Sequence, residues 1–145
     1  MRFVTKSCFV ALTALLALLS IAWTAAAAAP AVPREKKIAS YCSTSGDVCY
    51  GIFKRSGKVS LEITTAARYF NRYTLCVRRL PPRSTPAYAQ RCGSFPVFRQ
   101  SGSTWGSRVN YARQYPLTFA GTYRVTWKLA GSPLGPPLRF RLPVS

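Results

Sequence analysis

The stretch Thr122-Tyr-Arg-Val-Thr-Trp-Lys-Leu129 alternates strictly between polar and apolar side chains. Successive side chains of a β-strand point to opposite faces of the sheet. One face of this stretch would therefore carry Tyr123, Val125, Trp127 and Leu129, and the other would carry Thr122, Arg124, Thr126 and Lys128. An antiparallel sheet typically packs one face against the core and exposes the other to solvent. This stretch predicts a half-buried strand in an all-β protein.

The same alternation recurs from Tyr41 onward, interrupted by clusters of glycine, proline and serine, and no stretch keeps a helical period for three turns. We expect strands over Val48–Lys54, Lys58–Thr64, Tyr69–Arg78, Ala89–Arg99, Thr104–Arg113, Thr122–Leu129 and Leu138–Leu142. Ser56-Gly57 marks a tight turn, and the proline-rich run from Leu80 marks a longer loop. Seven short strands predict a single antiparallel β-sandwich, with a small closed β-barrel as the alternative.

The segment Leu117-Thr-Phe-Ala-Gly-Thr-Tyr-Arg-Val125 resembles the segment that leads into strand F of immunoglobulin-like and fibronectin-III-like domains. The resemblance places Tyr123 at the tyrosine corner, where its hydroxyl would turn back onto the backbone of the preceding loop. Two positions depart from the pattern. Phe119 stands where an acidic residue is often found, and Val125 replaces the strand F cysteine. The resemblance implies an architecture and leaves the function open.

The N-terminus has the order of regions found in a secretory signal peptide. Arg2 and Lys6 precede an apolar run from Cys8 to Trp23, which is followed by a run of small residues. The alternative is a transmembrane anchor, but the apolar run is shorter than the roughly 20 residues that a span needs. We therefore expect a signal helix over residues 1–28, a flexible leader over 29–39 and a disulfide-stapled domain over 40–145, with no membrane span after cleavage.

Cleavage after residue 28 would remove Cys8 and leave Cys42, Cys49, Cys76 and Cys92. An even number of cysteines in an exported chain predicts disulfides, for which three pairings exist. We favour Cys42 with Cys49 and Cys76 with Cys92, because turn-forming residues separate the members of each pair. Alternation puts Cys76 on the outer face of its strand, so its bridge would join neighbouring strands of one sheet.

The composition argues against an enzyme. The chain has no histidine and only three acidic residues, Glu35, Asp47 and Glu62, which leaves few groups for general acid and base catalysis. No nucleotide-binding loop, calcium loop or metal-ligand spacing is found, and we expect no cofactor and no metal. The mature chain would keep 19 of the 21 basic residues and all three acids, a net charge of 19 − 3 = +16.

This charge favours an anion-binding surface. If the strands at 122–129 and 138–142 pair, their outer sides bring together Arg124, Lys128, Arg139 and Arg141. The alternative is a basic face that serves solubility alone. Export makes anionic cell-envelope polymers or an anionic lipid surface better candidate partners than nucleic acid. A different hypothesis is a secreted inhibitor or toxin-like effector that acts through the loop at 80–90. The ligand and the oligomeric state stay open.

Overall fold

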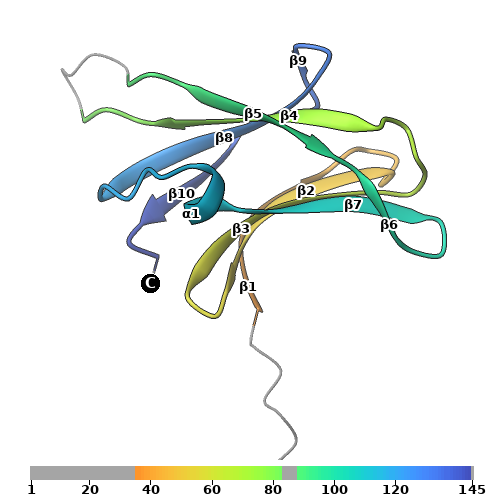
Figure 1. Ribbon diagram of the computed structural model, residues 1–145, viewed down its shortest axis with the longest axis horizontal. Coiled ribbons are helices and arrows are strands. Elements are labelled where there is room, and N and C mark those ends of the chain that lie inside the picture. The colour runs from red at the N-terminus through yellow and green to blue at the C-terminus, as the bar shows by residue number, and fades with distance from the viewer. Residues whose placement is uncertain (1–34, 83–87, 145) are drawn as a thin grey trace, which may run out of the picture. The chain divides into compact units, whose positions relative to one another are not determined.

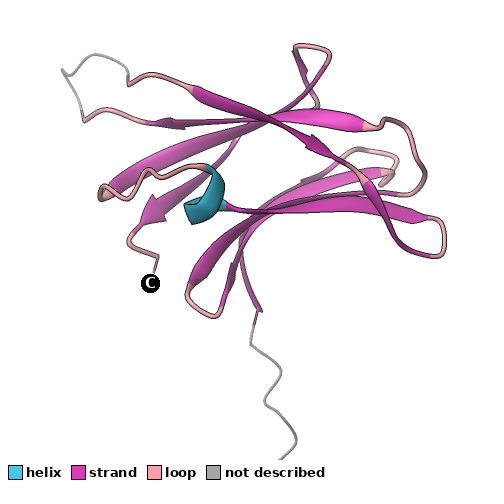
Figure 2. Ribbon diagram, in the orientation of Figure 1, coloured by secondary structure: helices cyan, strands magenta, loops and turns pink. Residues whose placement is uncertain are grey.

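The computed structural model describes residues 35–82 and 88–144, which form two antiparallel sheets and one short helix (Figure 1, Figure 2). The two sheets lie one above the other in Figure 1 and do not close into a barrel. The prediction of an all-β, two-sheet protein is therefore confirmed, and the barrel alternative is wrong.

Sheet A is the lower layer in Figure 1, and its strands follow the order β1-β2-β3-β7-β6. Their bounds are Glu35–Cys42 for β1, Val48–Arg55 for β2, Lys58–Thr65 for β3, Phe98–Ser101 for β6 and Thr104–Asn110 for β7. Ser56 and Gly57 join β2 to β3, with φ angles of 46° and 76°. Two consecutive positive φ angles are typical of a type I′ hairpin turn, at the position that the sequence predicts.

Sheet B is the upper layer, and its strands follow the order β10-β8-β4-β5. Their bounds are Arg72–Arg79 for β4, Arg91–Pro96 for β5, Gly121–Leu129 for β8 and Leu138–Leu142 for β10. A two-residue strand, β9 (Ser132–Pro133), pairs with the end of β8. The alternation predicted for 122–129 is present in β8, because Tyr123, Val125 and Trp127 are all buried.

The structure corrects the number of strands. Ten strands lie within the described residues, against the seven expected. The predicted strand at 89–99 is two strands in different sheets, because the chain crosses from sheet B to sheet A at the buried Val97. The amide of Val97 donates to the carbonyl of Asn71, which fixes this crossing. The predicted strand at 104–113 ends at Asn110, whose side chain caps the helix α1 (Tyr111–Gln114).

The expected leader at 29–39 also differs in part from the structure. From Glu35 onward it belongs to β1, which pairs with β2 from Glu35 to Cys42 with one register shift between Lys37 and Ala39. This segment has little apolar alternation, and backbone hydrogen bonds to the edge of β2 account for its pairing. Residues 29–34 and the expected signal peptide at 1–28 lie outside the described residues. No helix in the described part of the chain is long and apolar enough to cross a membrane.

Both predicted disulfides are present. Cys42 is bonded to Cys49, and Cys76 is bonded to Cys92. Each bridge joins directly opposite residues of neighbouring strands, β1 with β2 and β4 with β5. The expectation that Cys76 would link strands within one sheet is therefore confirmed. Although Cys76 lies on the outer side of β4, it is only 2% exposed, because β4 is an inner strand of sheet B.

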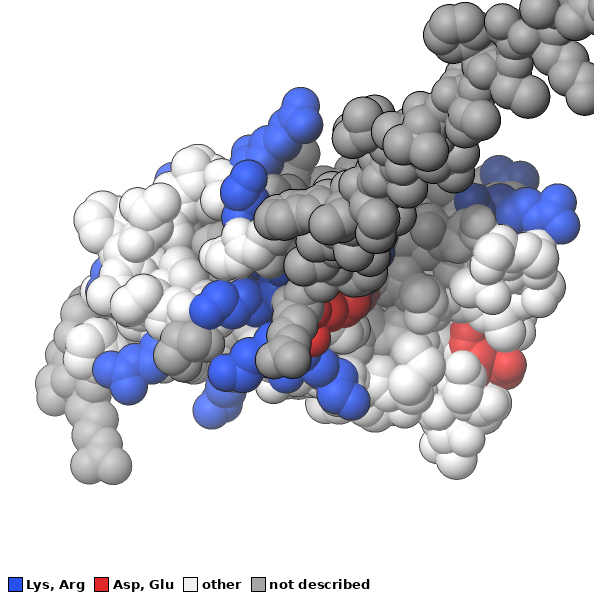
Figure 3. All heavy atoms as spheres, turned by 90° about the horizontal axis from the view of Figure 1, so that it is seen from below, with Lys and Arg blue, Asp and Glu red and all other residues white. Residues whose placement is uncertain are grey.

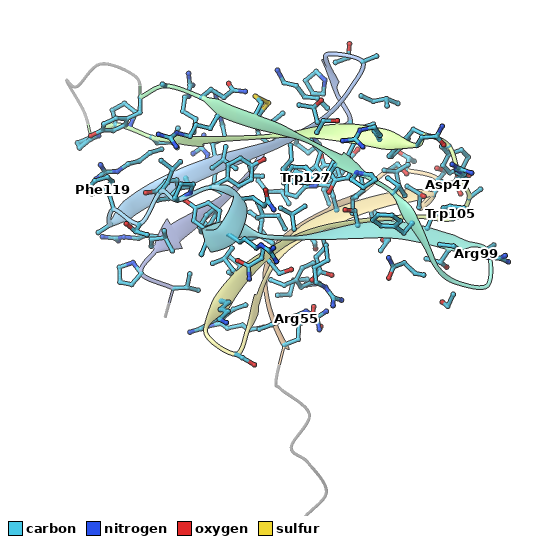
Figure 4. The ribbon with its side chains drawn as sticks, in the orientation of Figure 1. Asp47, Arg55, Arg99, Trp105, Phe119 and Trp127 are labelled. Carbon is cyan, nitrogen blue, oxygen red and sulfur yellow. A yellow bond between two sulfur atoms is a disulfide. The ribbon has the colours of Figure 1, made fainter. Side chains whose placement is uncertain are left out.

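Aromatic residues fill much of the space between the sheets. The ring of Trp127 stacks on that of Tyr50 from the opposite sheet, with centroids 4.6 Å apart, and Figure 4 shows Trp127 in the interior. At the other end of the core, Tyr111, Tyr123 and Phe140 pack together with centroids 5.0 to 5.8 Å apart. These contacts tie sheet A and α1 to sheet B.

Candidate anion-binding surface

The outer face of sheet B carries a row of arginines across three neighbouring strands. Arg139 of β10 lies directly opposite Arg124 of β8, and Arg124 lies directly opposite Arg78 of β4. Each of these arginines has a buried neighbour in its own strand, namely Phe140, Tyr123 and Val77, so the three arginines point away from the core. Neighbouring strands lie about 4.8 Å apart, so the row presents closely spaced positive charges.

The four residues predicted to form the anion-binding patch are not equally close to one another in the structure. Arg124 and Arg139 are opposite each other, and Arg141 lies two residues along β10, opposite Thr122. Lys128 is on the same face but four residues from Arg124, opposite Thr74 of β4. We call the set Arg78, Arg124, Lys128, Arg139 and Arg141 the basic face.

Arg78 is the member that the sequence prediction left out of the patch. Alternation along its strand indicates that it points outward, but alternation says nothing about which strand lies beside it. The register of β4 against β8 brings Arg78 next to Arg124. Its Nε atom is buried and has no hydrogen-bond partner among the described residues. A long-range pairing decides this contact, so local sequence could not reveal it.

The acidic residues all lie on the other sheet or beside it. Glu35 is in β1, Glu62 is in β3, and Asp47 is in the loop before β2, at the right-hand end of Figure 4. The described strands of sheet B contain no acidic residue. Positive charge on the basic face is therefore not offset by carboxylates of its own sheet.

In sheet A, by contrast, ion pairs with carboxylates neutralise part of the positive charge. Arg55 bridges two carboxylates, with its Nη2 atom 2.6 Å from Glu35 Oε2 and its Nε atom 3.2 Å from Glu62 Oε1. Arg108 Nε lies 2.8 Å from the same oxygen of Glu62. Figure 3, which views the molecule from the sheet A side, shows acidic side chains next to basic ones on this face. The ion pairs found among the described residues involve neither β8 nor β10.

Tyr123 is a buried residue near the start of β8. Its hydroxyl donates to the carbonyl oxygen of Phe119, 2.6 Å away, in the loop before β8. This bond ties the start of β8 to the loop that precedes it.

The loop at 80–90 is described only at its two ends, because residues 83–87 lie outside the described part. The amide of Leu80 donates to the carbonyl of Thr122, 2.7 Å away, which extends the pairing of β4 with β8 by one residue. On the other side, the Cys76–Cys92 bridge closes the base of the loop.

Fold and surface together define a class, a disulfide-bonded two-sheet protein with one strongly basic outer face. Comparison with protein-family models, with curated proteins and with solved structures gave no match.

Proposed function

We propose that this protein is exported and binds anionic polymers of the cell envelope through the basic face of sheet B. The observation that carries the proposal is the row Arg139, Arg124 and Arg78, on a sheet whose described strands hold no acidic residue. Like charges directly opposite each other on neighbouring strands destabilise a sheet. An anionic chain laid along this row would relieve the repulsion and pair with each guanidinium in turn.

A polymer suits this face better than a small anion. One exposed ion pair contributes only about 0–1 kcal/mol, so a single phosphate or carboxylate would bind weakly. Linked anions gain from effective concentration, because the second contact forms within an already bound complex. Arginine adds geometry, since its planar fork matches both carboxylate and phosphate.

Two disulfides support export, because such bonds persist mainly in oxidising compartments outside the cytoplasm. The proposal includes a non-enzymatic role. It is supported by the lack of histidine in the whole chain and by the engagement of Glu35 and Glu62 with arginines.

We also propose that the sandwich is immunoglobulin-like. The orders β2-β3-β7-β6 and β10-β8-β4-β5 correspond to the strand orders A-B-E-D and G-F-C-C′ of such domains, with β1 as an addition. In this correspondence β8 is strand F, the strand to which Tyr123 belongs. One departure is that the core tryptophan, Trp127, lies on β8 and not on the strand C equivalent, β4.

A secreted inhibitor or effector acting through the loop at 80–90 is the second candidate. It is favoured by the Cys76–Cys92 bridge, which holds the two ends of the loop together. Under this function, loop substitutions would abolish activity and charge changes on β10 would be tolerated.

The test measures binding of the mature protein to polyphosphate and to polygalacturonate over a salt series. We expect binding that weakens as salt rises, because screening shortens the reach of charges. The double change Arg139→Glu with Arg141→Glu should lower affinity about tenfold, equivalent to about 1.4 kcal/mol. The control is Lys58→Glu with Arg113→Glu, which alters net charge equally at exposed positions outside sheet B.

Equal losses in both double variants would mean that net charge matters and the basic face does not. Absent or salt-insensitive binding of the unchanged protein would overturn the proposal. Single-stranded DNA, run alongside, separates a preference for envelope-type polymers from a general attraction to polyanions.

A further inference from the structure

A second cluster of basic and aromatic side chains lies where β4 ends and β8 begins. Arg79 is the last residue of β4, and its Nη2 atom donates to the carbonyl of Ala120, 2.6 Å away. Its guanidinium carbon lies 4.9 Å from the ring centroid of Tyr88 and 5.7 Å from that of Phe119. Two cation–π contacts and one hydrogen bond therefore hold the guanidinium in place.

These side chains line a cavity of about 380 Å³ together with Ala89, Arg91 and Leu117. The cavity brings together three segments that are distant in the sequence, the end of β4, the residues leading into β5 and the loop before β8. Figure 4 shows Phe119 at the opposite end of the sandwich from Asp47 and Trp105. The sequence gives no local signal for this site, because no single segment contains it.

The exposure of the two rings points to a ligand. Phe119 is 68% exposed and Tyr88 is 36% exposed, although both are large apolar side chains beside a cavity. The Nε atom of Arg79 is buried and has no hydrogen-bond partner among the described residues. Arg91 is an exposed cation on the same cavity wall. The cavity thus offers ring faces, an apolar floor and positive charge within a small volume.

The chemistry that matches all three features is a saturated ring that carries an anionic group. The C–H face of a sugar ring packs against an aromatic ring, and a carboxylate on that sugar pairs with an arginine. A phosphate on a linear chain would use the charges and leave both rings exposed. The cavity volume is also within the range of small-molecule sites.

We propose that this cavity binds one carboxylate-bearing sugar ring of an acidic polysaccharide. The inference rests on the proposed function and narrows it from anionic polymers in general to polymers of acidic sugars. Arg78 and Arg79 are consecutive residues of β4 and point to opposite faces. A chain bound along the basic face would therefore have to pass around the end of β4 to place one of its sugar rings in the cavity.

The experiment compares oligogalacturonate with polyphosphate of similar charge, using calorimetry on the mature protein and five single variants. Phe119→Ala and Tyr88→Ala should each weaken oligogalacturonate binding roughly fivefold and leave polyphosphate binding unchanged. The matched control is Phe98→Ala, which removes a ring 60% exposed on β6 of the other sheet. Arg91→Gln, with Arg99→Gln as its control on β6, tests the charge.

A second readout is saturation transfer from aromatic protons to sugar C–H protons, which we expect in the unchanged protein and not in Phe119→Ala. If both polymers bind and the ring variants behave like Phe98→Ala, the cavity proposal fails and the proposed function stands. If only the ring variants and Arg91→Gln lose binding, while the β10 charge reversals do not, the cavity binds sugar and the basic face does not. If neither polymer binds the unchanged protein, both proposals fail.

Discussion

At the scale of single residues, tyrosine hydroxyls fasten loops to the core. Four buried tyrosines donate to backbone carbonyls at 2.6 to 2.8 Å, namely Tyr50 to Pro136, Tyr111 to Leu117, Tyr115 to Leu75 and Tyr123 to Phe119. Each ring supplies apolar area to the core, and each hydroxyl pairs with a carbonyl that lacks another described side-chain donor. Tyrosine therefore serves two purposes at these positions that phenylalanine could not.

The change Tyr115→Phe tests this role. It removes a buried hydrogen bond to the carbonyl of Leu75 and should lower the free energy of unfolding by about 1 kcal/mol, the net contribution of one such bond. Urea unfolding of the variant beside the unchanged protein measures the loss. Tyr69→Phe is the control, since that side chain is 53% exposed and should cost almost nothing. Equal effects at both positions would contradict the role assigned to the Tyr115 hydroxyl.

At the scale of elements, the two disulfides join neighbouring strands and do not link the two sheets. The Cys42–Cys49 bridge holds the edge strand β1 on β2, and the Cys76–Cys92 bridge holds the edge strand β5 on β4. Both bridges therefore secure strands that have a hydrogen-bonded neighbour on one side only. The two sheets are therefore held together by packing of the aromatic core and not by these disulfides.

Replacing each pair with alanine should destabilise the protein to different degrees. Loop-closure entropy predicts about 2.5 kcal/mol for the bridge that spans 7 residues and about 3 kcal/mol for the one that spans 16. Burial of Cys76 should widen this difference, because alanine leaves a gap there. Thermal and urea unfolding of the two double variants gives the ranking. A larger loss at Cys42 and Cys49 would contradict it.

At the scale of the whole molecule, the buried tyrosines and the many basic residues predict opposite changes in stability at alkaline pH. Burial raises the pKa of Tyr50 to about 12, with a further rise from the neighbouring Tyr41, and burial also raises the pKa of Tyr73 to about 12. The same cause raises the pKa of Tyr111 and of Tyr115. An unfolded tyrosine titrates near pH 10, so folding favours the protonated form of each.

The contribution of these tyrosines to stability should therefore be constant below about pH 9 and fall as the pH rises from about 10 towards 12, because the unfolded chain loses these protons first. Urea midpoints measured promptly at pH 7 to 11 test this, and absorbance at 295 nm reports tyrosinate. If repulsion among the basic residues dominated stability, deprotonation of lysines would raise the midpoint over the same range. A rising midpoint would contradict the tyrosine explanation.

Prediction from sequence worked best where the pattern is local. Side-chain type and spacing over a few residues predict the alternation of β8, the Ser56-Gly57 turn and the bounds of β10. They also predict the bounds of β3 to within one residue. Prediction from sequence failed at β1, whose pairing depends on the backbone edge of β2. It also failed at Val97, where the chain passes from one sheet to the other. At both places contacts distant in sequence outweigh local preference.

The sequence by itself determined the all-β class and the outward position of Arg124, Arg139 and Arg141, and it favoured the disulfide pairing that the structure has. These follow from the period of two along a strand and from turns that bring cysteines together. Only the tertiary structure decided that Arg78 completes the row, that the carboxylates gather on or beside sheet A, and that Arg79, Tyr88 and Phe119 share a cavity. The physical reason is that strand register and sheet order bring together segments tens of residues apart, which no local pattern encodes.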